Sequence, residues 1–400
     1  MDSQVSYLLI PQKSSSPING DTRRSANFPP NIWGDYFLSG TFRSTEIEDN
    51  IEEKVEALEE EVRKLLFSYV EKSSQQLSLI DSIQRLGIAY HFDTEINEAL
   101  DHVYKNYSFV SNESQKDLHI VALKFHLLRQ QRYSISCEIF DKFTNDEGNF
   151  KESLANEVRG MLSLYEASHM RMHGEDVLER ALTFSTINLE AAINNGSHEG
   201  SCGFGAQVRH ALKWPVFKAM PRLAARSYIS FYEEDPLHHP ALLSMAKLDF
   251  NILQKLYQKE LHEISRMCCL KWWKELKLVE KLCFARDRCV ECYTWALGTY
   301  FEPKYSLGRI ILSKIVVITS VLDDIFDLRG TFEELQLFIH AIERWDDNCI
   351  DQLPKYMKVY CEVLMDTYRR IEQNIRKDGI PYATHYAKEA IYSLLPYLYS

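Results

Sequence analysis

Hydrophobic positions recur every three to four residues along most of the chain, a spacing typical of amphipathic α-helices. The clearest case runs from Thr45 to Lys72, where Val55, Leu58 and Val62 line one side and glutamates fill the other. The same spacing predicts five further helices: Ile80 to Phe92, Thr94 to Tyr107, Leu118 to Gln131, Phe150 to His173 and Asp176 to Asn194. No repeat of fixed period is present, so we expect helical pairs packed in layers rather than a solenoid.

The length of 400 residues suggests two domains. A proline-containing, acidic stretch between Arg226 and Leu242 is the best candidate for their boundary. We therefore predict an amino-terminal helical domain at residues 23–235 and a carboxy-terminal domain at 236–400. Residues 1–22 are rich in serine and are expected to form a disordered tail, without the character of a signal or transit peptide.

The segment from Ile310 to Leu335 is among the most apolar of the chain and ends in three aspartates. Its β-branched residues favour a strand, but it exceeds the usual strand length, so we expect a buried helix. On a helix, Asp323 and Asp327 share a face, with Asp324 beside them. Such carboxylates suit a hard cation such as Mg²⁺, which is normally held by one or two carboxylates together with substrate phosphates. The alternative is an acidic helix end exposed to water.

Two arginines and a tryptophan precede this segment. Arg286 and Arg288 are two residues apart, so an extended loop would let both reach one anion, and guanidinium groups are preferred partners of phosphate. Trp295 offers a π face that attracts cations. The alternatives are a salt bridge within the loop, to Asp287 or Glu291, and a tryptophan that belongs to the core.

The amino-terminal arm, RRSANFPPNIW at residues 23–33, contains prolines that prevent a regular helix. Its arginines could bind phosphate, or the arm could fasten itself across another domain. We favour the second interpretation.

Composition excludes several classes of function. A net charge of −11 argues against binding to nucleic acid or to an anionic membrane, and no uninterrupted apolar stretch approaches the ~20 residues of a membrane span. Nine cysteines without a regular framework suggest reduced thiols in the cytoplasm. Cys289 and Cys292 form a CxxC that lacks a convincing second ligand pair for zinc. His169 and His173 lack the glutamate of a zinc-protease motif, so we do not expect them to bind metal.

These residues together resemble the plant class I terpene synthases, especially the cytosolic sesquiterpene cyclases. The likeness covers nearly the whole chain from Arg23 onward, including LHIVALKFHLLRQQRYSIS, HGEDVLERAL and RDRCVECYTWALGTYFEPKYSLGRIILSKIVVITSVLDDIFDLRGTFEEL. It implies an all-α protein with an amino-terminal α-barrel domain and a carboxy-terminal class I isoprenoid synthase helical bundle. It also implies a monomer that acts on farnesyl diphosphate with Mg²⁺, or alternatively Mn²⁺.

The resemblance gives each candidate residue a role. Asp323 and Asp327 would ligate the metal, and Asp324 would support them. Arg286 and Arg288 would capture the released diphosphate, and Trp295 would line the pocket of the carbocation.

Two departures from the family pattern affect these expectations. The second metal motif, (N/D)Dxx(S/T)xxxE, is not found, and the acids of WDDNCID (Asp346, Asp347 and Asp351) lie too near DDIFD to replace it. The leading interpretation is an enzyme, but we expect this 400-residue form, which ends within the bundle, to be inactive or nearly so. The alternatives are a pseudoenzyme that binds prenyl diphosphate and a helical scaffold. Arg132 in RQQRY stands where relatives usually have glycine, which questions the turn there.

Overall fold

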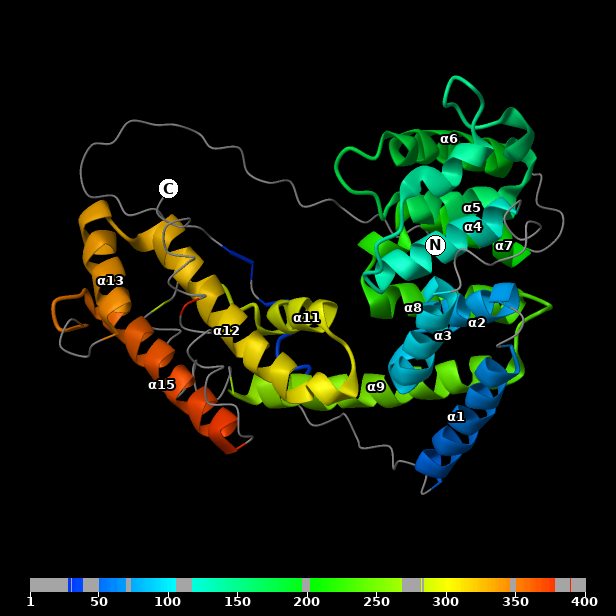
Figure 1. Cartoon of the computed structure of the whole chain (residues 1–400). Coiled ribbons are helices and arrows are strands. Elements are labelled where there is room, and N and C mark those ends of the chain that lie inside the picture. Colours follow the sequence, from blue (N-terminus) through cyan, green and yellow to red (C-terminus); the bar gives the residue numbers. More distant parts are fainter. Residues whose placement is uncertain are drawn as a thin grey trace. The chain divides into compact units, whose positions relative to one another are not determined.

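The computed structural model describes residues 28–29, 31–38, 50–69, 73–105, 117–195, 202–267, 282, 284–345, 350–377 and 389. Every regular element in these ranges is helical, as Figure 1 shows, and the only extended pairing among them is an isolated bridge between Thr144 and Phe150. The prediction of an all-α fold is confirmed. The expected disordered tail, residues 1–22, lies outside the described residues.

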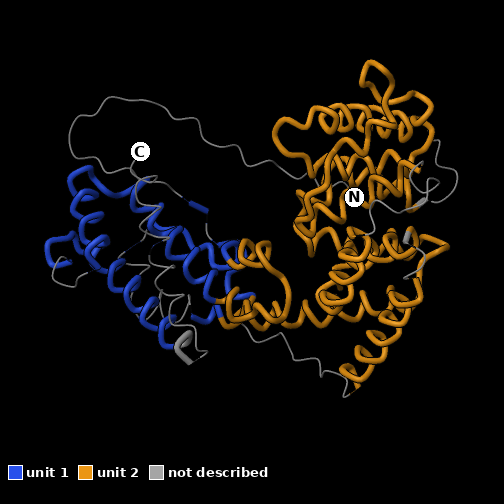
Figure 2. Tube along the Cα trace, viewed as in Figure 1, with its two compact units in different colours: residues 1–36, 264–292, 311–400 blue, residues 37–263, 293–310 orange. Residues whose placement is uncertain are grey.

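The chain divides into two compact units, which are coloured separately in Figure 2. Unit 1 contains residues 1–36, 264–292 and 311–400, and unit 2 contains residues 37–263 and 293–310. Neither limit coincides with the boundary predicted at residues 235 and 236. The proline-containing stretch there separates two helices that both belong to unit 2. The second of them, Pro240–Arg266, runs without a break past residue 263, where the first segment of unit 2 ends.

Unit 2 contains most of the helices of the chain. They are α1 (Ile51–Ser68), α2 (Ser73–Arg85), α3 (Asp93–Lys105), α4 (Leu118–Gln130), α5 (Val158–Ser168), α6 (Asp176–Asn194), α7 (Cys202–Lys213), α8 (Pro221–Glu234), and all but the last residues of α9 (Pro240–Arg266). Parts of α11 (Cys289–Thr299) and α12 (Ser306–Asp324) also belong to it. Short 3₁₀ segments (Ala89–His91, Cys137–Phe143, Glu152–Asn156, Val216–Lys218 and Pro303–Tyr305) join some of these helices.

The predicted helices agree with the observed ones to different degrees. The bounds of α6 are those predicted, and α4 ends one residue early. The prediction of a helix from Ile80 to Phe92 is wrong at both ends, because α2 begins at Ser73 and stops at Arg85. Gly87 ends it with a positive φ of 76°, and a Cβ there would lie 3.0 Å from the Ala225 side chain. The stretch predicted from Phe150 to His173 is a 3₁₀ turn followed by the shorter helix α5.

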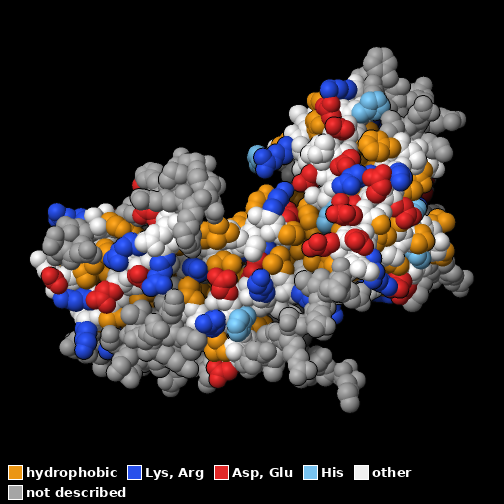
Figure 3. All heavy atoms as spheres, turned by 90° about the horizontal axis from the view of Figure 1, so that it is seen from below, with side chains coloured by type: hydrophobic (Ala, Val, Ile, Leu, Met, Phe, Trp, Pro, Cys, Tyr) orange, Lys and Arg blue, Asp and Glu red, His pale blue; other side chains and the backbone are white. Residues whose placement is uncertain are grey.

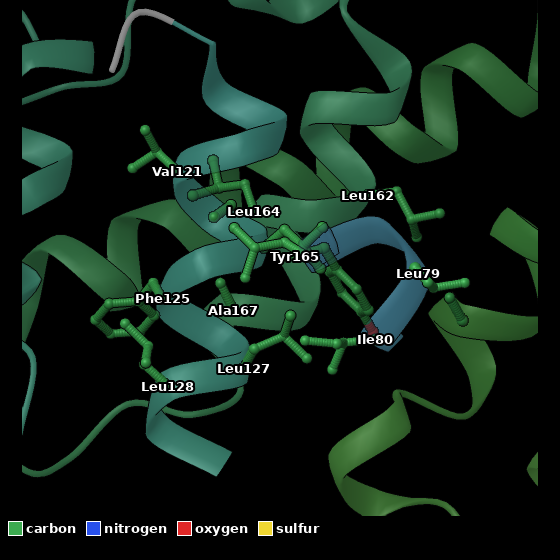
Figure 4. Close-up of a cluster of buried hydrophobic side chains, with 14 of the residues drawn as sticks. Leu79, Ile80, Val121, Phe125, Leu127, Leu128, Leu162, Leu164, Tyr165 and Ala167 are labelled. Atoms are coloured by element: carbon green, nitrogen blue, oxygen red, sulfur yellow. The ribbon is translucent and has the colours of Figure 1, made fainter. Parts of the chain in front are cut away.

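The core of unit 2 is built around α5, which packs against both α4 and α6. Figure 4 shows the side chains of α2, α4 and α5 that meet there. Ile80, Phe125, Leu127, Leu164 and Ala167 have no exposed surface. Because burial of one large apolar side chain contributes about 1.5–3 kcal/mol, this cluster accounts for much of the stability of the unit.

A buried ion pair also holds unit 2 together. The Arg309 side chain is fully buried and donates from Nε and Nη2 to the two carboxylate oxygens of Glu260, at 3.0 and 2.7 Å. The Tyr293 hydroxyl donates to the same carboxylate at 2.8 Å. Arg309 also donates to the carbonyl oxygen of Glu302 at 2.6 Å. This network ties α9, α11 and α12 to one another through fully satisfied polar groups.

Unit 1 contains the carboxyl end of α12, a π-helical turn at Ile325–Arg329, α13 (Phe332–Arg344) and α15 (Lys355–Lys377). Phe338 of α13 is fully buried, with its ring 5.5 Å from that of Tyr360 and 6.2 Å from that of Phe326. The Tyr360 hydroxyl donates to the carbonyl oxygen of Ile318 at 3.4 Å. α13 and α15 are thus fixed to the helix that carries the aspartates.

One helical run, Pro303–Arg329, is long and apolar enough to cross a membrane by length and composition. Core helices of soluble proteins meet the same criterion, and Arg309 in this run is buried against Glu260. The absence of a membrane partner stays a prediction.

On the face seen in Figure 3, basic and acidic side chains of the described residues are interspersed. The absence of a nucleic-acid partner stays a prediction from the net charge of −11.

Candidate active site

The three predicted aspartates lie where α12 ends, in three different environments. Asp323 has a side chain that is 42% exposed, Asp324 is fully buried, and Asp327 is exposed. The expected regular α-helix does not continue through them, because a π-helical turn replaces it from Ile325. Asp323 and Asp327 therefore do not have the relative orientation of residues four apart on an α-helix, which the sequence predicts.

Asp324 anchors the loop that carries the arginines. Its Oδ2 accepts a hydrogen bond from the backbone N–H of Arg286 at 2.8 Å, and its Oδ1 forms an ion pair with the Arg286 guanidinium. The same guanidinium lies 3.5 Å from Oδ2 of Asp323. Asp324 thus holds Arg286 within reach of the exposed carboxylate.

The amino-terminal arm contacts this loop through three side chains. The ring of Phe28 lies 4.6 Å from the Arg286 guanidinium carbon, and Asn31 donates from Nδ2 to Asp287 at 2.9 Å. The indole N–H of Trp33 donates to Glu291 at 3.3 Å. These contacts fasten the arm to the arginine loop. Arg286 pairs with Asp324 and Asp323, not with its sequence neighbours Asp287 and Glu291. Arg23 and Arg24 lie outside the described residues.

The electrostatics of Asp323 favour a bound cation. Burial raises the pKa of this carboxyl, the charge of Asp327 raises it further, and Arg286 and Arg288 oppose the shift only in part. A divalent ion would stabilise the charge of Asp323 that burial and Asp327 disfavour, and oxygen ligands suit Mg²⁺ or Mn²⁺. Asp323 and Asp327 therefore fit a metal that completes its coordination with water and phosphate oxygens.

Other metal candidates from the sequence receive no support from the geometry. Within the parts of the chain that the structure describes, no three His, Cys, Asp or Glu side chains gather into a metal centre. Cys289 and Cys292 are buried, and no cluster of metal-ligating side chains includes them in the described residues. His169 caps α5, whereas His173 lies beyond the end of that helix, so the two do not share a helical face. Asp346 and Asp347 lie outside the described residues, and Asp351 is in an exposed turn.

Two predicted site residues, Arg288 and Trp295, form no hydrogen bond or ion pair with the three described aspartates. Arg288 is partly exposed, and its charge acts on Asp323 only through the pKa effect already given. Trp295 is 53% exposed and belongs to unit 2. Its role in a cation pocket stays a prediction.

Unit 2 also contains a cavity of about 300 Å³ that the sequence did not indicate. Its lining includes the pair Asp81 and Arg85, joined at 2.9 Å, together with His126 and Glu166. These residues come from α2, α4 and α5, and no sequence motif links them.

Comparison with known proteins identifies the class. The family model "Terpene synthase, N-terminal domain" matches residues 32–212, and "Terpene synthase family, metal binding domain" matches residues 274–399. The chain belongs to the terpene synthase family. This membership supports the use of a divalent metal ion.

Two similar curated proteins come from Vitis vinifera. The (-)-germacrene D synthase is 52% identical over 384 residues, which are 96% of this chain and 66% of that protein. Valencene synthase is 49% identical over 396 residues, or 98% of this chain and 68% of that protein. The chain thus spans about two thirds of the length of these relatives.

Solved structures agree with this placement. Limonene synthase with 2-fluorolinalyl diphosphate has a TM-score of 0.81 and 34% identity, covering 94% of this chain and 68% of that one. Isoprene synthase from grey poplar, in complex with three Mg²⁺ ions and dimethylallyl-S-thiolodiphosphate, has a TM-score of 0.76 and 37% identity, covering 88% and 67%. The all-α terpene synthase fold is therefore shown.

Proposed function

We propose that this protein is a Mg²⁺-dependent sesquiterpene synthase that ionises farnesyl diphosphate and cyclises the resulting carbocation. The observation that carries the proposal is the arrangement at the end of α12. The carboxylates of Asp323 and Asp327 reach solvent, and Asp324 holds the Arg286 guanidinium 3.5 Å from Asp323. The names of the relatives, germacrene D and valencene synthases, favour a sesquiterpene.

The residues divide the work of ionisation. Asp323 and Asp327 would hold Mg²⁺, which when bound neutralises charge on the diphosphate oxygens. The allylic C–O bond breaks heterolytically, and both electrons leave with the diphosphate. Arg286 and Arg288 then provide guanidinium groups for the released anion. Because Asp324 is occupied by the Arg286 backbone, we assign it to positioning the loop rather than to the metal.

The carbocation that remains is attacked by a double bond of the same prenyl chain, and the cyclised cation finally loses a proton to the released diphosphate, which leaves a neutral hydrocarbon. We propose, from the family resemblance, that the π face of Trp295 stabilises this cation by about 0.5–2 kcal/mol. On the sequence grounds given above, we also propose a cytoplasmic monomer that acts without nucleic acid or membrane.

The test is gas chromatography with mass spectrometry of hydrocarbons formed from farnesyl diphosphate by residues 1–400 with Mg²⁺ or Mn²⁺. The Asp323→Ala variant removes a proposed ligand, and Asp351→Ala, whose side chain is 90% exposed, is the matched control. A cyclic product that is lost in Asp323→Ala and kept in Asp351→Ala supports the proposal. A folded protein that binds farnesyl diphosphate without forming product would instead favour the pseudoenzyme alternative.

A further inference from the structure

The π-helical turn at Ile325–Arg329 separates Asp327 from the regular part of α12. The backbone N–H of Gly330 closes it by donating to the carbonyl oxygen of Ile325 at 2.8 Å. Single π-turns inside α-helices are rare and frequently occur at functional sites. Since the turn contains Asp327, whatever stabilises it also sets the position of that carboxylate relative to Asp323.

Gly330 leaves no room for a side chain. A Cβ at this position would lie 2.5 and 2.7 Å from Cδ2 and Cγ of Leu335, and 3.2 Å from the Ile325 carbonyl oxygen. Its φ of −69° is open to any residue, so glycine is needed here for close approach rather than for backbone conformation. The turn is therefore packed directly against the first turn of α13.

The start of α13 is fixed by a capping box. The Thr331 hydroxyl accepts from the backbone N–H of Glu334, and Oε2 of Glu334 accepts from the backbone N–H of Thr331 at 3.2 Å. The same Oε2 accepts a hydrogen bond of 2.7 Å from the hydroxyl of Tyr356, in α15. Tyr356 thus secures the carboxylate that caps the helix immediately after Gly330.

The ring of Tyr356 meets the arginine loop. It packs edge-on against Phe284, with ring centroids 5.9 Å apart and an interplanar angle of 86°. Phe284 is two residues before Arg286, and its ring lies 5.9 Å from the guanidinium carbon of Arg329, the last residue of the π-turn. One tyrosine therefore contacts the arginine loop with its ring and, with its hydroxyl, the carboxylate that caps the helix following the π-turn.

We propose that Tyr356 is a positioning residue for the metal site: its hydroxyl, through Glu334, holds the π-turn that carries Asp327, and its ring holds the loop that carries Arg286. This inference rests on the proposed function, because the metal is the one proposed there. It deepens that function by making metal affinity depend on α15, which carries none of the predicted ligands.

The test compares Tyr356→Phe with Tyr257→Phe in residues 1–400. Tyr257 is the matched control, because its hydroxyl also donates a 2.7 Å hydrogen bond, to the Phe301 carbonyl of unit 2. The probe is Mn²⁺ alone, followed by electron paramagnetic resonance without substrate. We expect Tyr356→Phe to weaken Mn²⁺ binding about tenfold, as loss of an outer-shell partner commonly does. Tyr257→Phe should bind like the parent protein.

A second measurement separates positioning from general loss of stability. Hydrogen exchange at Gly330 reports the bond that closes the π-turn, and it should be at least several-fold faster in Tyr356→Phe and in Glu334→Gln but unchanged in Tyr257→Phe. Parent-like exchange and parent-like Mn²⁺ affinity in Tyr356→Phe would overturn this inference alone. A parent protein that binds no Mn²⁺, or an Asp323→Ala variant that binds it equally well, would overturn the proposed metal site as well.

Discussion

Asp324 binds Arg286 at two points, through the backbone N–H at 2.8 Å and through the guanidinium group. The aspartate has no exposed surface, whereas the arginine side chain keeps 20% of its own. The pair therefore joins the end of α12 to a loop 38 residues earlier in the sequence. Of the three acids in DDIFD, this one is fully buried and binds both the backbone and the side chain of Arg286.

We predict that Asp324→Asn destabilises the protein by about 3 kcal/mol, since removal of one member of a buried ion pair leaves the other charge without compensation. Urea unfolding monitored by circular dichroism measures the change. Asp366→Asn is the control, because it breaks the exposed pair between Asp366 and Arg370, which we expect to contribute less than 1 kcal/mol. Equal effects of the two variants would contradict a special role for Asp324.

At neutral pH we predict that Asp323→Asn stabilises the protein, whereas Asp324→Asn destabilises it. The pKa of Asp323 is raised in the folded protein, so its ionised form destabilises the fold. That penalty is absent at low pH, where the carboxyl is protonated in both the folded and the unfolded chain. It appears as the pH rises from the unfolded pKa through the raised folded pKa. Asp323→Asn should therefore be more stable than the parent at pH 7 and no more stable near pH 3. Urea unfolding at both values checks this, and a loss of stability at pH 7 would refute it.

The buried pair of Arg309 and Glu260 gives a prediction for unit 2. Glu260→Gln leaves the fully buried guanidinium without its counter-charge and should cost about 3–5 kcal/mol. Replacing both residues, as Glu260→Leu with Arg309→Met, should cost clearly less than the sum of the two single changes. A double-mutant cycle by urea unfolding measures this coupling, and additive effects would show that the pair is not an energetic unit.

Arg132 adopts a left-handed conformation, with φ of 65°. This conformation costs a non-glycine residue about 1–2 kcal/mol. Glycine removes that cost, but it also raises the entropy of the unfolded chain, which offsets part of the gain in stability. We therefore predict that Arg132→Gly stabilises the protein by about 0.5–1 kcal/mol. The neighbouring Gln131 has φ of −85°, so Gln131→Gly should destabilise it instead. Thermal melting of both variants distinguishes backbone conformation from the mere removal of a side chain.

His126 makes unit 2 sensitive to acid. Its side chain is 4% exposed, and burial lowers its pKa to about 4. Between the usual value of 6.5 and this value, the unfolded chain binds a proton that the folded chain does not, so stability falls as the pH falls. At pH 5 the loss is about 2 kcal/mol. His126→Gln should reduce the difference in unfolding free energy between pH 7 and pH 5, and the exposed His102→Gln should leave it unchanged.

The sequence predicted the elements whose signals are local. The bounds of α6 follow from its periodicity, and the apolar run before Asp323 forms the expected helix. The same periodicity does not show where α-helical geometry ends, because the hydrogen bond that closes the π-turn and the close packing of Gly330 on Leu335 leave no periodic signal. The close approach of Gly87, just beyond α2, to Ala225 of α8 likewise has no signal in the local sequence.

The candidate residues were identifiable by type, but their partners were not. Asp323, Asp327 and Arg286 stand out as groups suited to metal and phosphate. That Arg286 binds Asp324 rather than its neighbour Asp287 depends on chain segments brought together by folding. The contact between Tyr356 and Glu334 spans 22 residues and belongs to no motif. Long-range pairs of this kind leave no periodic signal in the sequence.

The contact between Asn31 and Asp287 has a consequence for biosynthesis, since the two residues are 256 positions apart. A ribosome that adds about 5–20 residues per second reaches Asp287 roughly 13–50 seconds after Asn31. During that interval the arm has emerged without its binding surface, while residues 37–263 of unit 2 are already available to fold. The arm is therefore made well before the loop that it binds and is among the last of the described segments to find its place.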